Sequence, residues 1–171
     1  MAIVKATYTR RGGTAKASVR YIEHRPGKDG ARTQRTLFTA EGKVARSEAY
    51  AMIDQAAKNS YFFRFVISPD PKAEDNDKTL LLRELADKTI AALDDRFQRP
   101  LRWVATIHDD HADHRHIHAI AIVPGRLQVQ DFQRMRSAAT AAAQEQRRHL
   151  DAMREQSQER SDGLGLELSL W

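Results

Sequence analysis

The chain has 171 residues, 41% of them hydrophobic, with no cysteine and a formal net charge of +5, which predicts one domain without disulfides or thiolate metal sites. No apolar run approaches the roughly 18 residues that cross a bilayer, and residues 1–8 lack the long apolar stretch of a signal peptide, so we expect a cytoplasmic protein without membrane insertion. Residues 1–36 carry nine lysines and arginines against two acids, and this local charge of +7 indicates either a polyanionic partner such as nucleic acid or an ordinary solvated surface.

The first half of the chain alternates predicted strands and helices. Residues 2–8 predict a strand. Residues 14–24 predict a helix, because Ala15, Val19 and Ile22 fall on one face at 100° per residue. The next elements, in chain order, are a short strand or hairpin at 31–40, a helix at 47–58 and a nearly continuous apolar strand at 61–68.

The second half predicts, in chain order, a helix at 77–98, two adjacent strands at 101–108 and 114–123, and a helix from 131 to about 160. The tail, residues 164–171, alternates at period two and predicts an edge strand. This order of elements predicts an α+β fold with a central, mainly antiparallel sheet, flanking helices and a long C-terminal helix. Residues 1–128 are expected to form the body, and residues 129–171 a helix and tail packed on it or on a partner.

Histidines gather in the two adjacent strands, since five of the seven lie between positions 108 and 118. Alternate side chains of a strand share a face, so His114, His116 and His118 point to one side. His108 reaches the same side if the two strands form an antiparallel hairpin. Converging imidazoles form a metal site, with Asp113 placed to accept a hydrogen bond from a ligand ring. The alternative is a solvated turn that happens to be rich in histidine.

The same residues resemble a known family. His116-Ile117-His118, followed by Ala-Ile-Ala-Ile-Val, is similar to the third motif of relaxases, which nick DNA in conjugative plasmid transfer and belong to the HUH (His-hydrophobic-His) endonucleases. Residues 19–22 (VRYI) resemble the first motif of the MobP class, which includes the Ti-plasmid border nickase, and residues 62–69 resemble a further strand of that class. The likeness covers about residues 1–125, with Arg115 in place of the usual proline.

The resemblance implies a relaxase-like catalytic domain that holds a divalent metal. Its ligands would be His108, His116 and His118, with His114 as the alternative to His108. The metal would be Mg or Mn in cells, although three imidazoles also suit Zn, Ni or Co. It would bind the scissile phosphate while a tyrosine hydroxyl attacks, which leaves a 5′-phosphotyrosine on the enzyme and a free 3′-hydroxyl on the DNA.

Four tyrosines compete for the role of nucleophile. Tyr8 and Tyr61 border strands and are expected to pack. Tyr50 lies in a predicted helix with only Arg46 as a nearby cation. Tyr21 lies about 130° from the core face of its helix. It also lies within the +7 segment, where cations favour a phenolate, so together with the motif this makes Tyr21 the predicted catalytic residue.

The predicted function is metal-dependent, site- and strand-specific nicking and strand transfer of single-stranded DNA at a transfer origin. Relaxosome accessory proteins and a coupling protein are possible further partners. The candidates for DNA phosphate contacts are Arg10, Arg11, Lys16, Arg20 and Arg64. The alternatives are a rolling-circle replication initiator, a non-catalytic DNA-binding accessory protein, and a hydrolytic nuclease that needs the histidines but no tyrosine.

Overall fold

The computed structural model describes residues 1–109 and 114–169. The strands are β1 (Ile3–Thr9), β2 (Leu37–Phe38), β3 (Lys43–Val44), β4 (Tyr61–Ser68), β5 (Arg102–His108) and β6 (His116–Val123). The helices are α1 (Gly12–His24), α2 (Arg46–Asp54), α3 (Leu82–Ala91), α4 (Asp94–Phe97) and α5 (Val129–Ser169).

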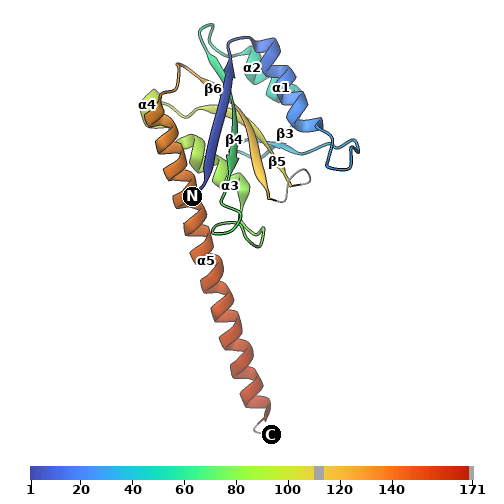
Figure 1. The fold of residues 1–171 in the computed structure, drawn as a ribbon, viewed down its shortest axis with the longest axis vertical. Helices are drawn as coiled ribbons and strands as arrows, with labels where there is room; N and C mark the ends of the chain where they lie inside the picture. Colours follow the sequence, from blue (N-terminus) through green and yellow to red (C-terminus); the bar gives the residue numbers. More distant parts are fainter. Residues whose placement is uncertain (110–113, 170–171) are drawn as a thin grey trace.

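The strands form one six-stranded sheet in the order β1-β4-β6-β5-β2-β3, and every neighbouring pair is antiparallel. Helices cover both faces of this sheet, and α5 continues well beyond it (Figure 1). The predicted α+β fold, with a mainly antiparallel sheet, flanking helices and a long C-terminal helix, is therefore confirmed.

The larger part of the core lies between one face of the sheet and the helices α3 and α5. Along β4 and β6 the side chains on this face are apolar at every second position, as the period of a strand requires. The fully buried members from the sheet and the two helices include Phe65, Ile67, Ile117, Ala119, Leu85, Ile90, Met135 and Ala139. The first half of α5 thus belongs to the same core as the sheet.

The opposite face of the sheet carries a smaller core under α1 and α2. Its residues include Ala15, Val19, Ile22, Met52, Ile53, Phe62, Val104 and Ile120. The predicted apolar face of α1 is therefore correct, because Ala15, Val19 and Ile22 are all buried. This second core covers only part of the face, and the histidines lie on the same face beyond it.

Helix α1 turns back from the end of β1 and runs along the sheet (Figure 1). Its C-terminal end lies close to the end of β5, because the Ile22 carbonyl is within 2.9 Å of the His108 ring. The helix ends at Arg25, since Pro26 disfavours a helical conformation at the residue before it. The remaining segment up to β2 is loop, so the strand predicted at 31–40 shrinks to Leu37–Phe38.

Two predicted helices have different bounds. The one predicted at 47–58 ends at Asp54. The one predicted to begin near Asp77 begins at Leu82 instead. Lys78 adopts a φ of 56°, in the left-handed region that a right-handed helix cannot include. The Asp77 side chain also accepts hydrogen bonds from the backbone and hydroxyl of Thr79, which compete with helix formation.

The edge strand predicted for the tail is wrong, because residues 164–169 continue α5 as helix. This part of α5 points away from the sheet, so no sheet edge is near enough to pair with it (Figure 1). A strand without a neighbour leaves its backbone groups unpaired, whereas a helix satisfies them within itself. Among the described helices, none combines the length and the apolar character that a membrane span requires.

The Arg115 side chain links the start of β6 to the loop before α3 by hydrogen bonds. Its guanidinium donates to both oxygens of Asp75, at 2.9 and 2.7 Å, and to the Leu80 carbonyl at 3.0 Å. The side chains of Arg115 and Asp75 are only 16% and 3% exposed. Replacing Arg115 by alanine leaves a buried carboxylate without its partner, which we expect to lower the free energy of unfolding by about 3 kcal/mol.

Urea unfolding in the presence of EDTA measures this loss without a contribution from metal. The matched control is Lys88→Ala, which removes solvent-screened ion pairs with Glu84 and Glu145 and should lower the free energy of unfolding much less. An equal loss of unfolding free energy in the two variants would contradict a structural role for the paired hydrogen bonds between Arg115 and Asp75.

Candidate metal centre

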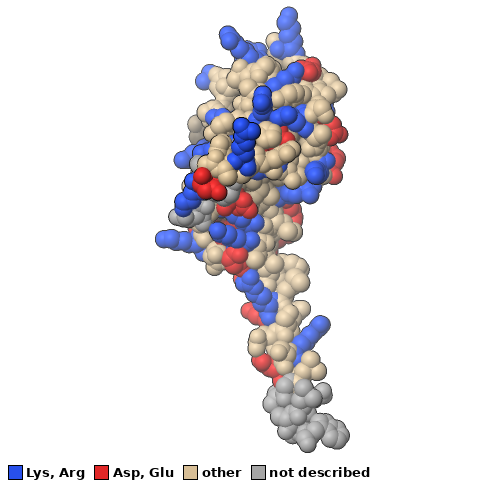
Figure 2. Space-filling model, turned by 90° about the vertical axis from the view of Figure 1, so that its right-hand side faces the viewer, with Lys and Arg blue, Asp and Glu red and all other residues tan. Residues whose placement is uncertain are grey.

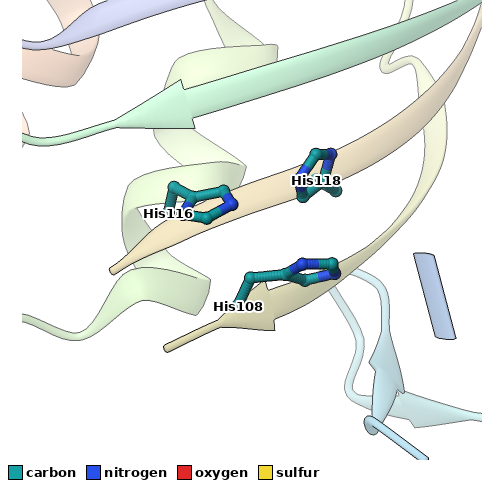
Figure 3. A group of neighbouring side chains, drawn as sticks. All are labelled: His108, His116 and His118. Atoms are coloured by element: carbon teal, nitrogen blue, oxygen red, sulfur yellow. The ribbon is translucent and has the colours of Figure 1, made fainter. Parts of the chain in front are cut away.

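The hairpin of β5 and β6 brings three histidines together. His108 pairs directly with His116, and His118 lies two residues further along β6 on the same face. All three rings point to the same side of the two strands (Figure 3). Their centroids are 5.4 Å apart for His108 and His116, 4.3 Å for His108 and His118, and 5.0 Å for His116 and His118.

One ligand nitrogen from each ring lies within 4.8 Å of the others. Nitrogen ligands bound at about 2.1 Å from one ion would be roughly 3 to 3.5 Å apart, so binding needs only a small closing movement of the rings. The cluster can therefore hold a metal ion. The three donors are neutral nitrogen ligands, which favour transition metals over the oxygen-preferring Mg and Ca.

His118 has the environment expected of a metal ligand. The side chain is 8% exposed, and both ring nitrogens are buried without a hydrogen-bond partner in the part of the chain that the structure describes. Burial lowers the pKa of His118 to about 3, helped by the nearby rings of His108 and His116. The imidazole is thus neutral at physiological pH and offers a lone pair. Because an unpaired buried polar group is costly, a metal ion would supply the interaction that is missing.

His108 is oriented by the end of α1. Its Nε2 lies 2.9 Å from the carbonyl oxygen of Ile22, one of the last carbonyls of the helix, which has no partner within the helix itself. A carbonyl oxygen only accepts, so Nε2 carries the proton and Nδ1 of the neutral ring carries the lone pair. Metal-binding histidines commonly donate their other nitrogen to a backbone carbonyl in this way. The partial negative charge at a helix C-terminus also favours a nearby cation.

The structure groups His108, and not His114, with His116 and His118. His114 precedes β6, and its ring centroid is 6.2 Å from that of His116. Among the described residues it does not belong to the cluster of possible ligands. The geometry therefore favours His108 as the third ligand over the alternative. Asp113, predicted to support a ligand ring, lies outside the described residues.

Tyr21 occupies the last turn of α1, next in the chain to the residue whose carbonyl contacts His108. Its side chain is 47% exposed, as its predicted position away from the core face requires. The guanidinium of Arg25 lies 5.9 Å from the centre of its ring. The helix predicted at 14–24 thus brings the backbone of its last turn, which includes Tyr21, to the edge of the histidine cluster.

Two of the other tyrosines lie on the wrong side of the sheet for this site. Tyr8 pairs with Phe63, and both lie on the face opposite the histidines. The Tyr8 ring lies 5.4 Å from Tyr61 and 5.3 Å from Phe63, but its side chain is 47% exposed, so the expected packing holds for Tyr61 and only in part for Tyr8. Tyr50 lies on α2, where Lys16 of α1 covers its ring at 5.7 Å.

Two arginines act on the cluster electrostatically. Arg64 lies on the same sheet face, since it pairs with Ile120, two residues beyond His118. The positive charges of Arg25 and Arg64 both help to lower the pKa of His118. Arg64 was among the predicted DNA-binding residues, whereas Arg25 was not. Its signal in the sequence was its place directly after the helix that carries Tyr21.

The remaining predicted DNA contacts lie along α1. Arg10 and Arg11 stand at its start, at the end of the sheet away from the histidines, and the Arg10 guanidinium covers the Tyr61 ring at 4.7 Å. Lys16 pairs with Asp54 of α2 at 2.5 Å, so part of its charge is already neutralised. Arg20 is exposed. Figure 2 views the molecule from the side of α1 and α2, where lysine and arginine outnumber the acids on the body.

No protein-family model, curated protein or solved structure matches the chain. The likeness to relaxases therefore rests on the quoted motif residues. The geometry of the histidine cluster and of α1 is the further ground for assigning a function.

Proposed function

We propose that this protein is a metal-dependent nickase and strand transferase of single-stranded DNA. The observation that carries the proposal is the buried cluster of His108, His116 and His118, joined by a hydrogen bond to the helix that carries Tyr21. A metal site, a tyrosine and two arginines within one small region of the surface are the groups that phosphodiester transfer through a covalent intermediate requires.

A divalent ion held by the three imidazoles would polarise the scissile phosphodiester and neutralise its charge. In the proposed reaction the Tyr21 oxygen attacks phosphorus, and the bond from phosphorus to the 3′-oxygen breaks. The phenol proton passes to solvent, and the departing 3′-oxygen takes up a proton to become a hydroxyl. The product is a 5′-phosphotyrosine on the protein. Attack by a 3′-hydroxyl reverses the step and rejoins a strand, so no nucleotide energy source is needed.

Arg25 and Arg64 have distinct tasks in this proposal. The Arg25 guanidinium lies 5.9 Å from the centre of the Tyr21 ring, where its positive charge would attract the phosphate that the Tyr21 oxygen attacks. Arg64 faces the same side of the sheet as the metal ligands and is placed to contact a substrate phosphate. Neither arginine transfers a proton, because a guanidinium stays charged.

We place the reaction at a transfer origin in plasmid mobilisation, with Mg or Mn as the cellular metal. Relaxosome accessory proteins and a coupling protein would be its partners there. A rolling-circle replication initiator would use the same side chains, and the neighbouring genes distinguish the two roles.

A covalent adduct with DNA is the direct test. The protein is incubated with Mn and a random library of single-stranded oligonucleotides, labelled at either the 5′ or the 3′ end. We expect the 3′ label to migrate with the protein under denaturing conditions and the 5′ label to appear in shortened strands. Nicking without an adduct would indicate a hydrolytic nuclease, and no nicking with Mn or Mg would favour the accessory protein.

DNA affinity should depend steeply on salt, because lysines and arginines displace counterions from phosphates. About five contacts predict a slope of log K against log salt of roughly −3 to −4, at about 0.7 per contact. Reversing the charge of both Arg10 and Arg11 should make this negative slope shallower by about 1.4, because two contacts are lost. Fluorescence anisotropy with a labelled single strand at several salt concentrations measures this.

The control for that measurement is the double charge reversal of Arg148 and Arg160, which are exposed on α5. It changes the net charge equally but lies outside the proposed contact face. An equal decrease of the slope in both variants would mean that α1 is not the contact surface.

A further inference from the structure

A pocket of about 170 Å³ lies beside the metal centre on the same face of the sheet. Phe62 and Ile120 line it, and they belong to the central strands β4 and β6. Ile120 follows His118 by two residues on the same face, a distance of about 6.6 Å along a strand. The pocket and the histidines therefore lie close together on the same face of the sheet.

The walls of the pocket are rich in hydroxyl groups. Thr7 comes from β1, and Thr14 and Ser18 come from α1. A hydroxyl both donates and accepts hydrogen bonds, so it suits the mixed donors and acceptors on the edge of a nucleobase and the oxygens of a sugar. None of the residues that line the pocket is acidic, so nothing in this lining repels a phosphate.

Arg64 joins the pocket to the metal centre. It lines the pocket, and on β4 it pairs with Ile120, two residues from His118 on the same face. Its guanidinium can hold a phosphate by two parallel hydrogen bonds. Three features thus follow one another along this face: the pocket, Arg64 and the metal centre. Their order matches that of a base, the next phosphate of the backbone and the scissile phosphate of one DNA strand.

We propose that this pocket binds the base and sugar of a nucleotide one phosphate away from the scissile phosphate, with Arg64 on the phosphate between them. This proposal rests on the proposed function, because it assumes a single DNA strand at the histidine centre. The pocket would therefore contribute to DNA affinity through contacts with a base, separately from the contacts with phosphates.

The test compares two labelled strands of equal phosphate number, an oligothymidine and an abasic strand, by fluorescence anisotropy. The wild-type protein is expected to bind the oligothymidine roughly ten-fold more tightly, because an abasic strand offers no base to the pocket. Ser18→Trp fills the pocket and should bring this ratio close to one while affinity for the abasic strand is kept. Ala51→Trp places the same ring on the exposed surface of α2 and should leave the ratio unchanged.

A second variant tests the pocket even if Ser18→Trp does not fold. Replacing both Thr7 and Thr14 by valine removes two hydroxyls at nearly constant volume, and we expect the ratio to fall by several-fold. A ratio near one in the wild type, or a ratio that Ser18→Trp leaves intact in a folded protein, would overturn the proposal.

The same measurement in EDTA, and on the variant Tyr21→Phe, separates the pocket from the chemistry. Suppose that the base-dependent affinity persists under both conditions but the wild-type protein with Mn forms no DNA adduct. The pocket assignment then stands and the assignment as a nickase fails. If the adduct forms and the affinity never depends on the base, the nickase stands and the pocket assignment fails.

Discussion

Replacing Tyr21 by phenylalanine is expected to abolish the covalent DNA adduct while metal binding and DNA affinity persist. The change removes one oxygen from a side chain that is 47% exposed, so stability should change by no more than about 0.5 kcal/mol. Nicking should fall to background, because phenylalanine has no oxygen with which to form the phosphotyrosine. Denaturing gel electrophoresis with the 3′-labelled library measures the adduct, and calorimetry measures the metal.

The matched controls are Tyr8→Phe and Tyr50→Phe. Tyr8 borders the proposed nucleotide pocket, but its ring packs on Tyr61 and Phe63 at the sheet face opposite the histidines, and the Tyr50 ring is covered by Lys16. Both variants should therefore still form the adduct. An adduct that persists in Tyr21→Phe and disappears in one of the controls would identify that tyrosine as the nucleophile instead. Strand cleavage that continues in Tyr21→Phe without any adduct would mean that water attacks the phosphate.

Metal uptake is expected to disappear when His116 and His118 are both replaced by alanine. Two of the three clustered imidazoles are then gone, and a single histidine does not hold a divalent ion tightly. In the wild type, a metal concentration about one hundred times the Kd should add about 2.7 kcal/mol to the free energy of unfolding, and the double variant should lose this gain. Isothermal calorimetry with Mn or Zn and thermal unfolding with and without EDTA measure the two effects.

Two further variants make the metal experiment specific. His118→Phe keeps a ring in the buried position but removes two nitrogens that have no hydrogen-bond partner among residues 1–109 and 114–169, so the metal-free protein should be at least as stable as the wild type. His114→Ala removes a neighbouring histidine outside the cluster and should leave the stoichiometry unchanged. Unchanged metal stoichiometry in the double alanine variant would rule out this site.

The parts of the fold that were predictable from the sequence are those that repeat with a simple period. Strands β4, β5 and β6 were predicted to within two residues at each end, because their buried faces leave runs of apolar residues. The common face of His116 and His118 follows from the period of a strand alone. The position of His108 beside them follows from the short connection between the two strands, which favours a hairpin.

Other features depend on contacts between distant parts of the chain and leave no local pattern. The late start of α3 depends on the left-handed conformation of Lys78. The alternating tail predicted a strand, but a strand also needs an edge to pair with, and α5 carries these residues away from the sheet. Arg25 was overlooked as part of the site because its proximity to His118 arises only when α1 packs on the hairpin.

The hydrogen bond between His108 and the end of α1 makes one mechanical unit of a metal ligand and the helix that carries the proposed nucleophile. Because its acceptor is a main-chain carbonyl, no side-chain substitution at Ile22 can delete it. A displacement of the helix relative to the hairpin does break it. Anything that shifts α1, including a substitution in its buried face at Val19, should therefore disturb the metal ligand and Tyr21 together, even though Val19 contributes no group to the chemistry.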